Sequence, residues 1–170
     1  AMEIGVTFPV IQEALAAFGG VQRRCHVRGE ARGVLVMDDY GHHPTEIKMT
    51  LKGLKNGFPD RRLVVVFQPP RYSRTQALFA DFTTAFYDAA SLYMIPIYTA
   101  SETPIPGVSA DDLAQAVKGH GHRHVVSIAV KEQVPEILAQ NVRDGDIVVF
   151  LGAGDVWRQG IKLLERLQKP

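Results

Sequence analysis

Two arginines in the middle of the chain have the type and spacing needed to bind an anion. Arg71 and Arg74 lie three positions apart where a predicted loop enters a helix, so both guanidinium groups can point the same way. Two such groups near a helix N-terminus form a good receptor for a carboxylate or a phosphate. The alternative is a pair of surface arginines that balance the charges of Asp81 and Asp88. The residue types alone leave both interpretations open.

Two more polar clusters occur in comparable positions. The three clusters span residues 38–44, 68–75 and 152–155, and they follow the first, second and last of five short apolar runs. Ligands of parallel α/β sheets bind beyond the carboxyl ends of the strands. We therefore expect the three clusters to share one edge of a sheet. Gly152 and Gly154 let the backbone approach either a ligand or a neighbouring helix closely.

The histidines do not predict a metal site. His42 and His43 are adjacent, so their side chains point apart, and no third ligand lies at helix or strand spacing from them. His120, His122 and His124 alternate with other residues in a glycine-containing segment, which favours an exposed loop before a strand. We expect no metal ligands in this chain.

The elements that would position these clusters alternate along the chain. Five apolar runs rich in β-branched residues predict strands buried on both faces, at 34–37, 63–67, 92–95, 125–128 and 147–151. Helical spacing of apolar residues occurs over 47–54, 78–89, 113–117, 134–138 and 157–164. Ser109, three residues before Asp112, predicts a helix N-cap. This alternation predicts an α/β fold, a three-layer Rossmann-like domain with a mainly parallel sheet of about six strands flanked by helices.

The first thirty residues do not follow the same pattern. A short helix is predicted to end at Gly19 and Gly20, and residues 25–30 are predicted to form a strand that pairs antiparallel at the edge of the sheet. Ala1 before Met2 resembles the scar of a cleaved tag, and we expect the chain to be an excised fragment. A boundary within 21–24 would make residues 1–24 the end of a preceding domain and residues 25–170 the domain of interest.

Composition limits the possible functions. The 170 residues include 19 Lys+Arg and 18 Asp+Glu, a net charge of +1, which argues against nucleic acid or a membrane surface as the main partner. No run of roughly 18 or more apolar residues occurs. The single cysteine, Cys25, is expected to be a buried, unreactive thiol on a strand in a protein of a reducing compartment. No G-x-x-x-x-G-K-[ST] loop and no nucleophile elbow is present, so any enzymatic centre must lie partly outside this chain.

Four motifs in the same order resemble the C-terminal domain of the Mur ligase family. They are Arg23-Arg24, the run Asp-Asp-Tyr-Gly-His-His-Pro-Thr-Glu at 38–46, the run Phe-Gln-Pro-Pro-Arg-Tyr-Ser-Arg-Thr at 67–75, and Leu-Gly-Ala-Gly-Asp at 151–155. The resemblance covers essentially the whole chain. Pro70 stands where the family pattern leads us to expect a histidine.

The resemblance implies a cytoplasmic enzyme of peptidoglycan synthesis that uses ATP and Mg²⁺. The implied reaction adds L-alanine to UDP-N-acetylmuramate through an acyl phosphate, with ATP and Mg²⁺ held mainly by a central domain. The fragment should pack against that domain and be inactive alone. The residues implied are Arg24 for the ATP phosphates, Asp39 for the ATP ribose, Tyr40 and His42 for the lining of the closed site, and Arg71 and Arg74 for L-alanine.

Two other functions remain open. A recycling ligase of the same family attaches a murein tripeptide to the same nucleotide sugar, although the run Arg-Tyr-Ser-Arg at 71–74 favours the enzyme that adds single alanine residues. The other alternative is a stand-alone, non-enzymatic module that binds a nucleotide or another anion.

Overall fold

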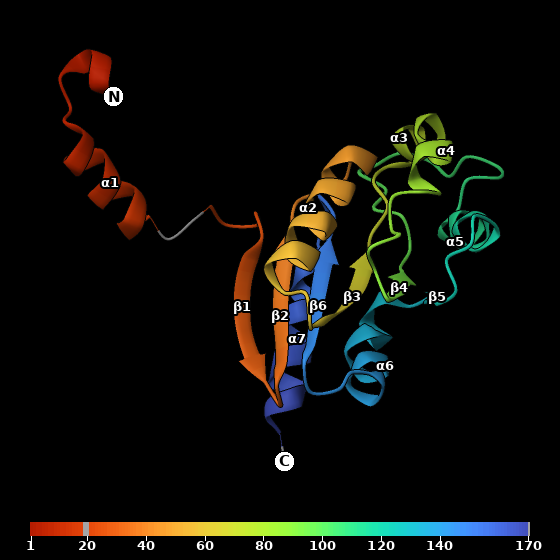
Figure 1. The fold of residues 1–170 in the computed structure, drawn as a ribbon. Coiled ribbons are helices and arrows are strands. Elements are labelled where there is room, and N and C mark those ends of the chain that lie inside the picture. The colour runs from red at the N-terminus through yellow and green to blue at the C-terminus, as the bar shows by residue number, and fades with distance from the viewer. Residues whose placement is uncertain (19–20, 170) are drawn as a thin grey trace.

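The computed structural model describes residues 1–18 and 21–169, and its centre is one six-stranded sheet (Figure 1). The strands lie in the order β1-β2-β6-β3-β4-β5. The edge strand β1 (His26–Ala31) pairs antiparallel with β2 (Val34–Asp39), and the other neighbours are parallel. The remaining strands are β3 (Arg62–Phe67), β4 (Ser91–Met94), β5 (Val125–Ser127) and β6 (Asp146–Leu151). The predicted mainly parallel sheet with an antiparallel edge strand is confirmed.

Helices cover both faces of the sheet and make it the middle of three layers. One face packs against α2 (Pro44–Gly57), α4 (Phe79–Phe82) and α5 (Ala110–Gly119), the other against α6 (Val134–Asn141) and α7 (Trp157–Gln168). The short helix α3 (Tyr72–Ala77) precedes α4. Alternate residues of one strand enter the two cores, as Leu35 and Val36 of β2 do. This two-sided burial explains why β2, β3, β4 and β6 read as continuous apolar runs. The prediction of two-sided burial is wrong for β5, an edge strand of which only Val125 is buried. Each large apolar side chain that is fully buried contributes about 1.5–3 kcal/mol.

The predicted single helix over 78–89 is wrong. Helix α4 stops at Phe82, and turns follow over 83–88. Thr83 and Thr84 each donate a side-chain hydrogen bond to the carbonyl three residues back, at 2.6 and 3.3 Å. Such hydroxyls compete with the helical backbone for its acceptors, which favours turns. Of the apolar stripe, Phe82, Phe86 and Ala89 are buried in the core, and the partly buried Leu78 packs against it.

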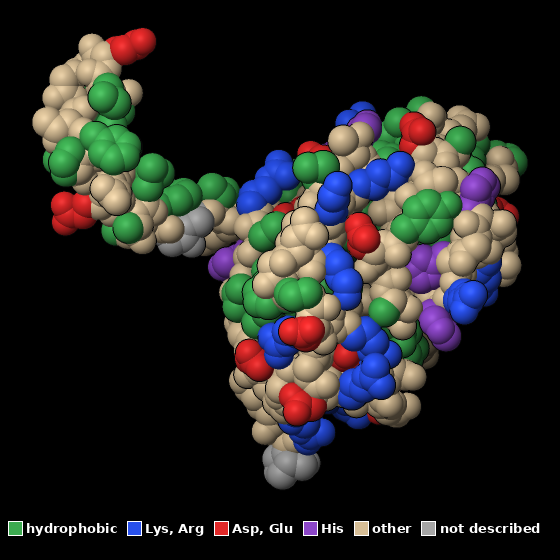
Figure 2. Space-filling view, viewed as in Figure 1, with side chains coloured by type: hydrophobic (Ala, Val, Ile, Leu, Met, Phe, Trp, Pro, Cys, Tyr) green, Lys and Arg blue, Asp and Glu red, His purple; other side chains and the backbone are tan. Residues whose placement is uncertain are grey.

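The N-terminal helix α1 (Phe8–Ala17) lies apart from the sheet, after a short 3-10 segment at Met2–Ile4 (Figure 1). None of its residues is buried, and its apolar side chains are uncovered in Figure 2. Phe8 and Leu15, for example, are 61% and 68% exposed. The predicted helix terminator, Gly19 with Gly20, lies outside the described residues.

Two side chains differ from their predicted burial. Cys25 is exposed and precedes β1, with a left-handed backbone (φ 42°), because its amide turns to donate to Asp39 at 2.8 Å. Partial burial and the Asp39 carboxylate raise the pKa of this thiol, which disfavours the reactive thiolate. His122 is 7% exposed, because its ring lies against the backbone of Phe86 and Ala89. Burial lowers the pKa of this imidazole.

Candidate functional site

The three polar clusters meet at the carboxyl edge of the sheet. In the strand register, Leu151 of β6 lies beside Asp39 of β2 on one side and beside Phe67 of β3 on the other. The loops that follow are tied together, since the Gly152 amide donates to the Asp39 carbonyl at 3.2 Å and the Gln68 amide donates to the Leu151 carbonyl at 3.0 Å. The loops after these three strands therefore share one edge.

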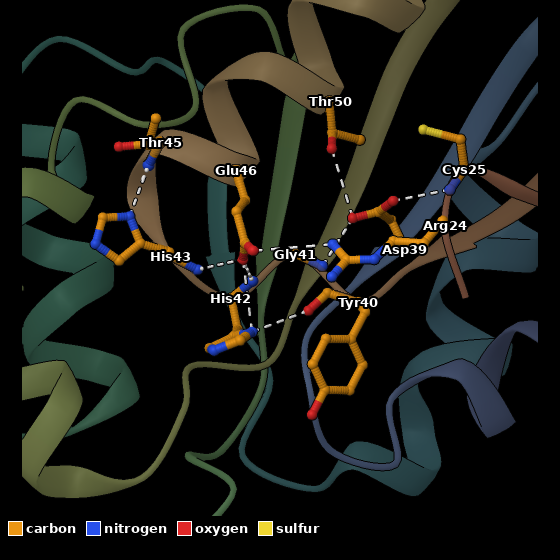
Figure 3. Close-up of polar contacts among 10 residues, drawn as sticks. All are labelled: Arg24, Cys25, Asp39, Tyr40, Gly41, His42, His43, Thr45, Glu46 and Thr50. Carbon is orange, nitrogen blue, oxygen red and sulfur yellow. Dashed lines mark hydrogen bonds and ion pairs between the residues drawn. The ribbon is translucent and has the colours of Figure 1, made fainter. Parts of the chain in front are cut away.

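Asp39 fixes the loop after β2 to the segment before β1 (Figure 3). Its carboxylate is buried and accepts hydrogen bonds from the Gly41 amide at 2.7 Å and from the Cys25 amide at 2.8 Å. Thr50 of α2 donates to the same carboxylate at 3.5 Å. A Cβ at position 41 would lie 2.8 Å from an Asp39 oxygen, so glycine is needed there.

Glu46 organises the start of α2. Its carboxylate accepts hydrogen bonds from the His42 and His43 amides at 3.0 and 3.1 Å, while the His43 side chain accepts from the Thr45 amide, which completes a capping box. Partial burial alone would raise the pKa of Glu46, but the two amide donors, with His42 and Arg24, lower it on balance. Glu46 was not among the residues predicted for the site. The sequence does contain a signal for its capping role, because Glu46 lies in the first turn of a helix that begins at Pro44.

Arg24, Tyr40 and His42 lie together above this loop. The Tyr40 and His42 rings meet edge to face at 5.3 Å, and the Arg24 guanidinium lies 5.6 Å from the Tyr40 ring centre. The Arg24 side chain is 54% exposed, and its guanidinium approaches Glu46 no closer than 3.8 Å. Its donors therefore remain accessible to a ligand.

Arg71 and Arg74 lie at the start of α3, Arg71 as its N-cap residue and Arg74 as its third residue. Arg71 is 51% exposed, with its Nε 3.5 Å from Glu102. Glu102 in turn accepts hydrogen bonds from the Ser73 amide and hydroxyl at 2.9 and 2.6 Å, which lower the pKa of its carboxyl. Among the described residues, neither arginine pairs with the aspartates at 81 and 88.

Gln68 fastens the loop after β6. Its side chain donates to Asp155 at 3.2 Å and accepts from the Val156 amide at 3.2 Å. Lys131 donates to the same aspartate at 2.5 Å. Partial burial would raise the pKa of Asp155, but Lys131 and Gln68 lower it on balance. A cavity of about 420 Å³ opens beside this network, lined by Gln68 and by residues 96–99 and 129–132.

The structure thus brings the predicted residues into two groups on one edge. Arg24, Asp39, Tyr40 and His42 form the first group, and the second consists of Arg71 and Arg74, which the start of α3 places three positions apart along the chain. Within residues 1–18 and 21–169, no group of three or more His, Cys, Asp or Glu side chains is placed to hold a metal ion. In the same ranges, no helix has the length and apolarity needed to cross a membrane.

The family model described as "Mur ligase, glutamate ligase domain" matches residues 23–154. The chain belongs to this family. It is 55% identical over 167 residues to the UDP-N-acetylmuramate–L-alanine ligase of Trichlorobacter lovleyi. The aligned residues make up 98% of this chain and 37% of that relative. This Mur ligase domain therefore spans little more than a third of the length of the curated relatives it matches.

Two solved structures are also similar. The crystal structure of UDP-N-acetylmuramate–alanine ligase from Thermotoga maritima matches with a TM-score of 0.83 and 25% identity, over 98% of this domain and 35% of that chain. A murein peptide ligase from Psychrobacter arcticus matches with a TM-score of 0.71 and 22% identity, over 99% of this domain and 35% of that chain. The second match shows a common fold alone.

Proposed function

We propose that this chain is the C-terminal, amino-acid-binding domain of a cytoplasmic ATP-dependent ligase that adds L-alanine to UDP-N-acetylmuramate. The observation that carries the proposal is the carboxyl edge of the sheet, where Arg24 and Arg71 expose about half of each side chain and have no ion-pair contact shorter than 3.5 Å. Accessible guanidinium groups suit the carboxylate and phosphate groups of such a reaction. The relative that is 55% identical supplies the substrate names.

The proposal includes a division of the chain into two parts. Residues 1–24 would be the last helix and linker of a central ATPase domain, and residues 25–170 the Mur ligase C-terminal domain. Two observations support this division: α1 buries none of its residues, and the family model begins at residue 23. An apolar helix with no buried side chain is expected to pack against a domain outside this chain.

ATP and Mg²⁺ do not fit this domain by itself. The described residues offer no cluster of carboxylates for a metal ion, and the sequence has no phosphate-binding loop. We assign both to the remainder of the ligase, where the metal would neutralise phosphate charge. This domain would add Arg24 to the phosphates. It would also add Asp39 to the ribose, but that carboxylate is buried and already accepts from Cys25, Gly41 and Thr50, so the contact would require it to become accessible in the complete ligase.

Arg71 and Arg74 would bind the α-carboxylate of L-alanine and neighbouring substrate oxygens, with Tyr40 and His42 lining the closed site. Charge-assisted hydrogen bonds of this kind strengthen when domain closure expels water. They would hold the alanine amine beside the acyl phosphate. The amine nitrogen then forms a bond to the acyl carbon, loses a proton, and phosphate leaves as the carbon–oxygen bond breaks. Holding the two reactants together removes much of the entropic barrier.

Amide formation by the complete ligase tests this proposal. We expect ATP turnover that depends on UDP-N-acetylmuramate and L-alanine, and none with the isolated 170-residue chain. Turnover with a murein tripeptide and none with L-alanine would assign the domain to a recycling ligase instead. Tight ATP binding by the isolated chain, measured by calorimetry, would favour a stand-alone nucleotide-binding module.

A further inference from the structure

Two adjacent arginines in the segment before β1 have different surroundings. Arg23 is half-buried, and its Nη2 donates to the carbonyls of Gly152 and Gly154 at 2.8 and 2.9 Å. Its guanidinium also lies 4.7 Å from the Tyr40 ring centre. Arg24, by contrast, exposes 54% of its side chain, and its contacts are looser: 3.8 Å to Glu46 and 5.6 Å from its guanidinium to the Tyr40 ring centre.

The backbone around Arg23 has an unfavourable conformation that needs external support. Arg23 and Cys25 both have left-handed φ angles, 61° and 42°, which residues with a Cβ seldom adopt. Two hydrogen bonds to the loop after β2 hold this segment. The Tyr40 amide donates to the Arg23 carbonyl at 2.7 Å, and the Cys25 amide donates to Asp39 at 2.8 Å.

The loop that receives the Arg23 side chain is itself rigidly placed. A Cβ at position 152 would lie 2.9 Å from the Gln68 carbonyl oxygen, and a Cβ at position 154 would collide with the Gln68 and Tyr98 side chains. Gly152 also has φ 147°, in the range that favours glycine. The carbonyls of this loop therefore form a fixed acceptor pair for one guanidinium group.

We propose that Arg23 is a positioning residue that locks residues 23–25 onto the loop after β6 and so directs Arg24 toward the carboxyl edge. The importance of Arg24 for phosphate binding rests on the proposed function, but the lock itself is a property of this chain. The Nη2 group of Arg23 binds the loop after β6, whereas the neighbouring Arg24 guanidinium is exposed and available to a ligand. An arginine fits this role better than a lysine, because one planar group donates to two carbonyls and stacks on an aromatic ring.

Amide hydrogen exchange in the isolated chain tests the lock. Arg23→Ala should speed exchange of the Cys25 and Tyr40 amides by roughly tenfold or more, the effect of losing a charge-assisted hydrogen bond from a local opening. Arg24→Ala is the matched control and should change these rates by less than about twofold. Arg23→Lys should recover part of the protection. The Leu92 amide, which donates to His124 within the sheet, reports whether each variant remains folded.

Kinetics of the complete ligase test whether the lock matters for the reaction. Arg23→Ala should lower kcat by roughly tenfold, while the KM for L-alanine stays within about twofold because Arg71 and Arg74 are untouched. Arg23→Lys should recover part of kcat. Wild-type exchange rates in Arg23→Ala would overturn the lock, and faster exchange with an unchanged kcat would overturn the positioning role. A wild-type ligase without L-alanine-dependent turnover would refute the proposed function, and the exchange rates would still decide on the lock.

Discussion

The two ends of the sheet use arginine in different ways. At the amino end, Arg62 at the start of β3 donates to both oxygens of Asp146 at 2.8 and 2.6 Å, and the Arg143 amide donates to the same carboxylate at 2.9 Å. Asp146 is 1% exposed. At the carboxyl end, Arg24 and Arg71 lie 3.8 and 3.5 Å from their carboxylate partners and are half exposed.

This difference separates arginines that stabilise the fold from arginines that remain available to a ligand. Close, two-pronged contacts with a buried partner cost too much to break during a reaction cycle, whereas long contacts at the surface are exchanged at little cost. What distinguishes the two kinds of arginine is the length of the contact, not the end of the sheet at which the arginine lies. Arg23 and Arg28 lie toward the carboxyl side, yet both have partners within 2.9 Å, and we assign both to the structure.

Removal of Asp146 should have the largest effect on stability. Asp146→Ala leaves the half-buried Arg62 and the Arg143 amide without their acceptor and should lower the free energy of unfolding by about 3 kcal/mol. Urea denaturation measures this change. The exposed Asp60→Ala is the control and should shift the value by less than about 0.5 kcal/mol. Equal losses of unfolding free energy in the two variants would show that Asp146 stabilises the fold no more than an exposed aspartate does.

Removal of either arginine of α3 should affect substrate binding and leave the fold intact. In the complete ligase, Arg71→Ala or Arg74→Ala should raise the KM for L-alanine about tenfold to above a hundredfold, from loss of about 1.5–3 kcal/mol of charge-assisted bonding. The free energy of unfolding should stay within about 0.5 kcal/mol of wild type. The exposed Arg123→Ala, beside the amino end of β5, serves as the control. Unchanged kinetics for both α3 variants would remove the anion-site assignment.

Glu46 should give a smaller, pH-dependent effect. Because the pKa of Glu46 is lowered in the folded chain, its ionised form stabilises the fold above the usual pKa, and this contribution is lost as the pH falls through the lowered value. At pH 7, Glu46→Gln should cost about 0.5 kcal/mol after allowance for solvent screening of a partly exposed group. At pH 3 the two proteins should differ less. A difference that is constant across this range would show that charge plays no part.

Much of the fold could be predicted from local patterns, since β-branched apolar runs mark the strands. Ser109 likewise accepts the Asp112 amide at 3.0 Å at the start of α5, as its spacing predicts. The helix predicted over 78–89 failed because two threonine hydroxyls compete for backbone carbonyls, which apolar spacing does not reveal. The prediction of an exposed loop was wrong for His122, because its burial depends on the backbone of Phe86 and Ala89, far away in the sequence.

The shared edge of the three polar loops was predictable from the sequence, and the contacts that join these loops were less so. The loops after the strands identify the carboxyl edge, and the family resemblance selects Asp39, Arg71 and their neighbours. The role of Arg23 could not be read from the sequence, because its acceptors lie 129 and 131 positions away. The exposure of Cys25 was not predicted for a similar reason. The apolar pattern of a strand does not show the hydrogen bond that its amide donates to Asp39.

A structure of the complete ligase with an ATP analogue and L-alanine would show whether Arg71 and Arg74 bind the amino acid. The quantity to measure is the distance from the alanine carboxylate to the guanidinium groups of Arg71 and Arg74. We expect a hydrogen-bond distance of about 2.7–3.2 Å to at least one of them. We also expect that Arg24 reaches the phosphates while Arg23 keeps its two carbonyl partners. Alanine bound away from this edge, with these arginines still facing solvent, would contradict the assignment.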